Sequence, residues 1–151
     1  MSDINISQQE ADALIKIEKN VTSCKVFVFP TQINPEKIDI PLLSVDEREE
    51  FILSIRRKQL ILEKQNHQLR VRKSIILLRL DINGPTHTNP DGTIISGSHL
   101  HIYREGFGDK WAYDIPAEKF NNLSDVYQTA MDFMDYCNIN KKPNFQKDLF
   151  V

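Results

Sequence analysis

The sequence predicts an α+β fold: a mostly antiparallel sheet of about five or six strands, with an N-terminal and a C-terminal helix packed on one face. Two patterns predict it. Segments in the middle of the chain alternate apolar and polar residues with the period of a strand, and both ends carry apolar residues at helical spacing. The chain has 151 residues, 40% of them hydrophobic and 26% charged, which suits one folded domain covering residues 1–151.

The two helices are predicted from their capping residues. Ser7 and Glu10 have the spacing of a capping box, so a helix is expected over residues 8–20. Asn122, with Asp125 three residues later, is expected to begin the last helix. The side of that helix expected to face the core carries Val126, Ala130, Phe133 and Cys137.

The strands are predicted from alternation and from the turn formers between them. Pro35 and Pro41 indicate a loop over residues 32–41. The segment 74–82 has apolar residues on both sides along most of its length, so we expect a central strand buried on both faces. The segment 60–69 is expected to pair back on the strand before it. Strands are predicted over residues 25–29, 50–57, 60–69, 74–82, 99–105 and 110–115.

One predicted strand carries an unusual set of polar side chains. Residues 99–105 alternate, so that Leu100 and Ile102 lie on one face and four polar groups on the other. Two imidazoles, a phenol and a carboxylate in one row are more than plain contact with solvent requires, so this face is interpreted as the functional one. The row consists of His99, His101, Tyr103 and Glu105.

Further polar groups are expected beside this row. The neighbouring strand ends in Arg79 and Asp81, and His87 lies in the loop, dense in turn formers, that connects the two strands. Lys110 begins the return strand. Since strand ends and loops usually build sites, we expect these side chains to converge with the polar row at one end of the sheet.

The first functional hypothesis is cleavage of RNA without a metal or another cofactor. His99 and His101 would act as general base and general acid, because an imidazole titrates near neutral pH. Arg79, Lys110 or Arg104 would stabilise the charge that develops on the phosphorus. The orienting groups, and those at the margin of the site, would be Tyr103, Glu105, Asp81 and His87.

Basic residues are concentrated between residues 56 and 73. This window has seven basic residues and one acidic residue, so it carries a charge of +6 on a chain whose net charge is −2. Such a patch fits contact with phosphates or with an acidic partner protein, and in the first hypothesis it would bind the RNA backbone. The alternative is a strand edge that lysine and arginine protect from pairing. The residues expected to bind are Arg56, Arg57, Arg70 and Arg72.

The second hypothesis is a metal site. His99, His101 and Glu105 have the spacing HxHxxxE, and in this segment the chain resembles the cupins. The resemblance implies that two histidines and a carboxylate hold one ion. Gly92 and Gly106 do not fall at the distances found in cupins, and the pattern does not predict their run of eight strands.

The third hypothesis is a protein that catalyses nothing and binds another protein, for example a phage-encoded inhibitor of a bacterial defence nuclease. Aromatic residues and arginine serve interfaces well, and this face carries Tyr103, Arg104, Trp111 and Tyr113. A fourth alternative is that His99 and His101 are ordinary surface residues of a strand.

Three stretches resemble a small family of uncharacterised bacterial and mobile-element proteins. They are LRLDINGP at residues 78–85, NPDG at residues 89–92 and HLHIYREGFGDKWA at residues 99–112. The family has no assigned activity, so the resemblance implies no catalytic residues. It implies a small accessory protein of mobile DNA, such as a toxin–antitoxin or anti-defence component, with RNA, an antitoxin or a defence protein as its partner.

The sequence predicts neither a membrane protein nor an oxidised one. Cys24 and Cys137 lie far apart and are expected to be reduced thiols in the core. No run approaches the roughly 18 apolar residues of a membrane span, and the N-terminus does not have the basic and then apolar order of a signal peptide. We therefore expect a cytoplasmic protein without a membrane partner.

Overall fold

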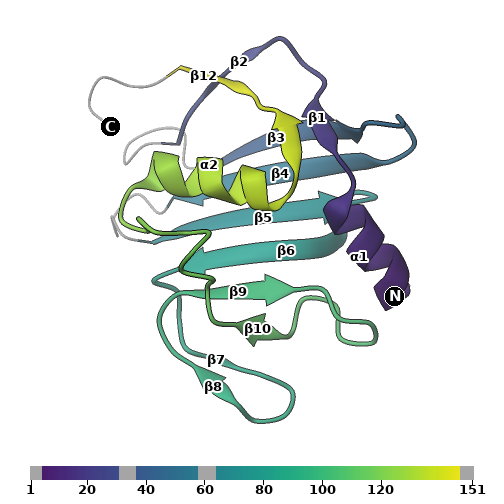
Figure 1. Ribbon diagram of the computed structural model, residues 1–151. Coiled ribbons are helices and arrows are strands. Elements are labelled where there is room, and N and C mark those ends of the chain that lie inside the picture. The colour runs from purple at the N-terminus through teal and green to yellow at the C-terminus, as the bar shows by residue number, and fades with distance from the viewer. Residues whose placement is uncertain (1–4, 31–36, 58–63, 147–151) are drawn as a thin grey trace.

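The computed structural model describes residues 5–30, 37–57 and 64–146 (Figure 1). These residues form two helices and twelve strands. In chain order they are α1 (Gln8–Lys16), β1 (Lys19–Val21), β2 (Val26–Val28), β3 (Lys37–Ser44), β4 (Glu50–Arg57), β5 (Gln65–Val71), β6 (Ile75–Ile82), β7 (His87–Thr88), β8 (Ile94–Ile95), β9 (His99–Ile102), β10 (Ala112–Tyr113), α2 (Val126–Tyr136), β11 (Ile139–Lys141) and β12 (Asn144–Gln146).

One sheet dominates this part of the chain. Its eight strands lie in the order β10-β9-β6-β5-β4-β3-β1-β11, and every neighbouring pair is antiparallel except β1 and β11. The prediction of a mostly antiparallel sheet is confirmed, and so is the pairing of β5 back on β4, although residues 60–63 lie outside the described residues. The sheet has more strands than predicted, because three-residue strands such as β1 and β11 are too short to show alternation. Two small sheets, β2 with β12 and β7 with β8, complete the fold.

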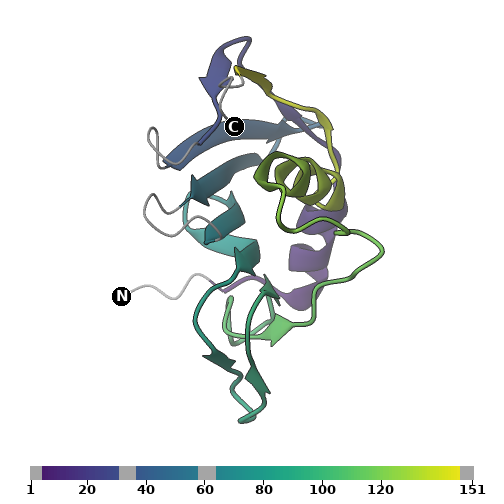
Figure 2. The same ribbon diagram turned by 90° about the vertical axis from the view of Figure 1, so that its left-hand side faces the viewer.

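Both helices lie on the same side of the sheet (Figure 2). The ring of Phe133 on α2 packs against the ring of His67 on β5, with the centroids 5.8 Å apart. We call this side the helix face and the opposite side the open face. Neither of the described helices is long and apolar enough to cross a membrane. Of the two free cysteines, Cys137 is buried as expected, whereas Cys24 is exposed.

The helix boundaries differ from the predicted ones. Ser7 caps α1 by accepting a hydrogen bond from the Glu10 amide at 3.1 Å, but the helix ends at Lys16 because the chain turns into β1. The N-cap of α2 is Asp125, whose carboxylate accepts from the Gln128 amide at 3.0 Å. Asn122 lies before the helix and does not cap it.

Strand β6 is buried on one face, and the expectation of burial on both faces is wrong. The pairing with β5 contains a bulge, because Leu69 pairs with Leu78 while Arg70 pairs with Ile76. The extra residue, Leu77, shifts the alternation, so that the two apolar rows of the sequence merge on the helix face. Ile76, Arg79 and Asp81 are left on the open face and are partly exposed.

The loop predicted over residues 32–41 is wrong for its described part, since β3 starts at Lys37. Pro41 pairs with Ile52 of β4, while on the other side β3 contacts β1 only through Leu42, Leu43 and Ser44. Pro41 thus lies just beyond the last residue that pairs with β1. A proline without an N–H is tolerated there because none of the described strands pairs with it on that side. Residues 32–36 lie outside the described residues.

His67 is a buried residue of β5. Its side chain is on the helix face, fully buried, and Nε2 lies 2.6 Å from Oε1 of Gln65. Burial lowers the pKa of His67 to about 3 from its ordinary value of 6.5, and the nearby Asp81 charge opposes this shift only in part. The imidazole is therefore neutral in the folded protein at neutral pH.

We expect this histidine to make the protein less stable in acid. Below pH 6.5 His67 is protonated in the unfolded chain, whereas in the folded chain it stays neutral until the pH nears 3. Lowering the pH through this window therefore favours unfolding, by up to about 1.4 kcal/mol per pH unit. The measurement is urea unfolding of the wild type and of His67→Gln at pH 7 and pH 5. The wild type should lose about 2 kcal/mol more than the variant, and an equal loss in both proteins would refute the assignment.

Candidate functional site

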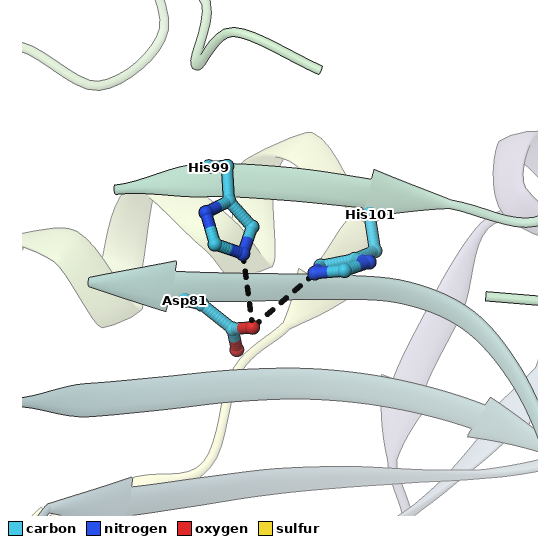
Figure 3. Close-up of side chains that lie close together, drawn as sticks. All are labelled: Asp81, His99 and His101. Atoms are coloured by element: carbon cyan, nitrogen blue, oxygen red, sulfur yellow. Dashed lines mark ion pairs between the residues drawn. The ribbon is translucent and has the colours of Figure 1, made fainter. Parts of the chain in front are cut away.

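The pairing of β6 with β9 brings four polar side chains together at one end of the open face. Arg79 is opposite His101, and Asp81 is opposite His99. Residues two apart on a strand share a face, so all four side chains leave the sheet on the same side. Figure 3 shows the rings of His99 and His101 turned toward the carboxylate of Asp81.

One carboxylate oxygen lies between the two imidazoles. Nε2 of His99 is 3.4 Å from Oδ2 of Asp81, and Nε2 of His101 is 3.3 Å from the same oxygen. The histidine rings themselves have centroids 4.8 Å apart. His99 is only 2% exposed and His101 only 1%, while the side chain of Asp81 keeps 17% of its surface. The cluster is thus covered, and the carboxylate is its most accessible member.

The other ring nitrogen of each histidine contacts a backbone carbonyl. Nδ1 of His99 is 3.0 Å from the oxygen of Gly97, and Nδ1 of His101 is 2.8 Å from the oxygen of Asp109. Because a carbonyl only accepts, each Nδ1 donates its proton there, and in a neutral ring Nε2 then carries the lone pair. Burial and the charge of His101 lower the pKa of His99, which favours its neutral form.

Asp81 is oriented from both sides. The side-chain amide of Asn66 donates to Oδ1, and Nε of Arg79 forms an ion pair with Oδ2 at 3.3 Å. Burial alone would raise the pKa of Asp81. The contact with His101 and the positive charge of Arg79 outweigh this effect and hold the pKa of Asp81 below its usual value. Asp81 is therefore a carboxylate at neutral pH.

Arg79 connects this cluster to the turn after β9. Its Nη1 is 2.6 Å from Oδ2 of Asp109, and its Nη2 is 3.0 Å from Nε2 of His101. Asp109 and Asn66 were not among the predicted site residues. Asp109 follows the polar row in a turn, which is a weak signal. Asn66 can be found only when the register of β5 against β6 is known, since it pairs with Asp81.

A short arm, β7 and β8 with their connection, carries His87 to the cluster. The ring centroid of His87 is 4.7 Å from that of His101 and 5.7 Å from that of His99. Asn89 fixes the arm to β10, because its side chain accepts from the Ala112 amide at 2.8 Å and donates to the Ala112 carbonyl at 3.0 Å. The predicted approach of His87 to the two histidines is thus present in the structure.

Tyr103 and Glu105 do not join the cluster, because β9 ends at Ile102 and the alternation ends with it. The Tyr103 hydroxyl donates to the carbonyl of Ile6 at 2.8 Å, and Oε1 of Glu105 accepts from the amide of Gln8 at 2.7 Å. Both side chains hold the segment that leads into α1. In the structure they therefore have a positional role away from the histidines.

Arg104 and Lys110 also lie apart from the cluster of Asp81, His99 and His101. The guanidinium of Arg104 is stacked over the Trp111 ring, 4.2 Å from its centroid. Lys110 is exposed and contributes only its backbone carbonyl, which accepts from Nε2 of His87 at 2.7 Å.

The basic window does not form one surface. Arg56 and Arg70 lie on the open face, whereas Arg57, the next residue after Arg56, points the other way. Arg72 is already paired, at 2.8 and 2.9 Å, and positions 58–63 lie outside the described residues. The carboxylates that pair with Arg72 are those of Glu10 and Glu49.

Asp81, His99 and His101 have the donor set and spacing of a metal site. Each offers one ligand atom, and these atoms all lie within 4.8 Å of one another. A tetrahedral ion with bonds of about 2.0–2.2 Å separates its ligand atoms by about 3.4 Å. The two histidine–carboxylate distances, 3.4 and 3.3 Å, match this separation between ligand atoms. The HxHxxxE interpretation is thus wrong in its third ligand: Glu105 is absent from the cluster and Asp81 takes its place.

Fold and cluster together define an α+β protein with a covered centre of two histidines and one carboxylate. The chain belongs to the family of unknown function DUF6978, whose model matches residues 6–139. This match extends beyond the C-terminal stretches that resemble an uncharacterised family and includes α1 as well as the cluster. Neither the curated proteins nor the solved structures include a significant match.

Proposed function

We propose that this protein binds one divalent transition-metal ion of the zinc type through Asp81, His99 and His101. The observation that carries the proposal is the convergence of three donor atoms within 4.8 Å. Imidazole nitrogen and carboxylate oxygen are donors that zinc and other first-row divalent ions accept in proteins. The donors come from the paired strands β6 and β9, which makes their geometry rigid.

The surroundings of the three residues support this proposal. Metal-bound histidines usually donate their second ring N–H to a carbonyl or carboxylate, and both histidines do so, to Gly97 and Asp109. The amide of Asn66 likewise holds the second oxygen of Asp81. These contacts orient the two Nε2 lone pairs and Oδ2 of Asp81 toward a common point.

Electrostatics supports it as well. Two lone pairs and a carboxylate oxygen face one another in a covered place, and acceptors of this kind need a positive charge between them. Arg79 supplies part of that charge through its contact with Nε2 of His101 at 3.0 Å. An ion would displace this contact, and the pair of Arg79 with Asp109 at 2.6 Å would keep the guanidinium close by.

Three protein ligands leave one position of a tetrahedral ion open. Zinc proteins use such a position for water or substrate. Asp81 is the ligand with exposed surface, so the open position would be reached from its side.

The test is a calorimetric titration of metal-free protein with Zn²⁺ at pH 7.5. We expect one site per chain, weakened at least about 100-fold in Asp81→Asn, because the amide carries no charge. Glu105→Gln is the matched control: its side chain is outside the cluster, and its affinity should equal that of the wild type. Equal zinc affinity in wild type and Asp81→Asn, or no binding by the wild type, would refute the proposal.

The ribonuclease and protein-inhibitor hypotheses stay predictions from the sequence. A general acid and base must reach the substrate, and His99 and His101 are 2% and 1% exposed. Acid–base chemistry on RNA would therefore require the arm that carries His87 to open. This is why we place the metal proposal first.

A further inference from the structure

A groove crosses the open face beside the metal centre. It encloses about 340 Å³ and has mostly polar walls, which is within the size range of sites for small molecules. We call it the open-face groove. Its lining residues are Lys37, Ser54, Arg56, Asn66, Gln68, Arg79 and Asp81.

The strand register explains how these residues meet. Arg56 of β4 pairs with Asn66 of β5, Asn66 pairs with Asp81 of β6, and Asp81 pairs with His99 of β9. Strands are about 4.8 Å apart, so Arg56 and Asp81 leave the sheet about 10 Å from each other along this row. A single small molecule can therefore contact Arg56 at one end and the neighbourhood of Asp81 at the other.

The groove has an excess of positive charge at the Arg56 end. The charge of Arg79 is matched by Asp81 and Asp109, at 3.3 and 2.6 Å. Among the described residues, Lys37 is paired only with Asp39, at 3.6 Å and with both side chains largely exposed, an arrangement that contributes little. Within the described ranges the Arg56 side chain has no hydrogen bond or ion pair. Arg56 also lines a second hollow next to the groove, which adds Lys64.

We infer that the open-face groove binds the phosphoryl group of a small organic phosphate, with Arg56 as its main contact. A guanidinium presents paired N–H donors that match phosphate oxygens. A phosphate monoester carries about two negative charges at pH 7, which suits the two weakly matched cations Arg56 and Lys37 better than a single carboxylate does. The inference deepens the proposed function and rests on it in one respect: because Asp81 lines the groove, the phosphate would lie next to the bound ion.

The experiment titrates metal-free and zinc-loaded protein with inorganic phosphate at constant ionic strength. We expect binding that weakens about 10-fold or more in Arg56→Gln, the effect of one charge-assisted hydrogen bond. Arg48→Gln is the matched control, since Arg48 is exposed in the turn at the other end of the β3–β4 hairpin and should leave the affinity unchanged. Succinate should bind more weakly than phosphate.

Phosphate affinity that is equal in wild type and Arg56→Gln, or absent from both the metal-free and the zinc-loaded form, would overturn the inference. Succinate binding as tight as phosphate binding would overturn the class of ligand. Failure of the metal proposal can be told apart from these outcomes. It would appear as an absence of zinc binding, whereas the phosphate titration of the metal-free protein tests the groove independently of zinc.

Discussion

Replacing Lys19 with methionine is expected to lower the free energy of unfolding by about 3 kcal/mol. Lys19 is fully buried, and its Nζ donates to three carbonyl oxygens, those of Ile15, Ile17 and Cys137, each at 2.8 Å. The first two carbonyls lie at the end of α1 and the third at the end of α2. One ammonium thus satisfies terminal groups of both helices that have no partner within the helix.

The sign of this effect follows from what the substitution leaves behind. Burial lowers the pKa of Lys19 to about 8, so the ammonium is still charged at pH 7, at a cost in desolvation. Methionine removes that cost, and replacing a whole buried pair can be neutral. Here, however, three carbonyls stay buried without a donor, and each unsatisfied group costs about 1–3 kcal/mol.

Urea unfolding at pH 7 measures the effect of this substitution. Lys119→Met is the control, because Lys119 is exposed and its replacement should change stability by less than about 0.5 kcal/mol. If Lys19→Met is as stable as the wild type, the three hydrogen bonds do not hold the helix ends.

Zinc at a free concentration of about 100 times its dissociation constant is expected to raise the free energy of unfolding by about 2.7 kcal/mol. The reason is that the proposed donors come from β6 and β9, which meet only in the folded chain. The stabilisation should vanish in His99→Ala at the same zinc concentration. Unfolding curves with zinc and with a chelator measure it.

Glu105→Gln should keep the full zinc stabilisation, since Glu105 accepts its hydrogen bond from Gln8 away from the cluster. A stabilisation that survives in Asp81→Asn but is lost in Glu105→Gln would show that the sequence spacing HxHxxxE, and not the observed cluster, holds the ion.

The alternation of the sequence predicted the strands that matter for the site. It placed His99 and His101 on one face of β9, and it placed Arg79 and Asp81 at the end of a neighbouring strand, where the structure has them. It failed at the bulge of β6, because a bulge depends on how a strand meets its partner and not on its own residues. It also extended the polar row to Glu105, three residues past the end of β9.

Two buried polar residues were not predicted from the sequence. Lys19 and His67 are fully buried, and nothing in the local sequence distinguishes them from surface residues. Lys19 is buried because two helix ends need a donor, and His67 because β5 lies under α2. Both causes are tertiary contacts between distant segments. Asn66 and Asp109 could not be predicted as site residues for the same reason, because their contacts depend on the strand register and on the conformation of a turn.

The visible absorption spectrum of the protein with bound Co²⁺ tests the proposed metal centre most directly, since cobalt reports its coordination geometry. We expect one equivalent of Co²⁺ to give the intense visible bands of a four-coordinate site, and excess Zn²⁺ to abolish them. Asp81→Asn and His101→Ala should lack these bands. A wild-type spectrum that equals that of Co²⁺ in buffer, or intense bands that persist in both variants, would contradict the assignment of Asp81, His99 and His101 as the ligands.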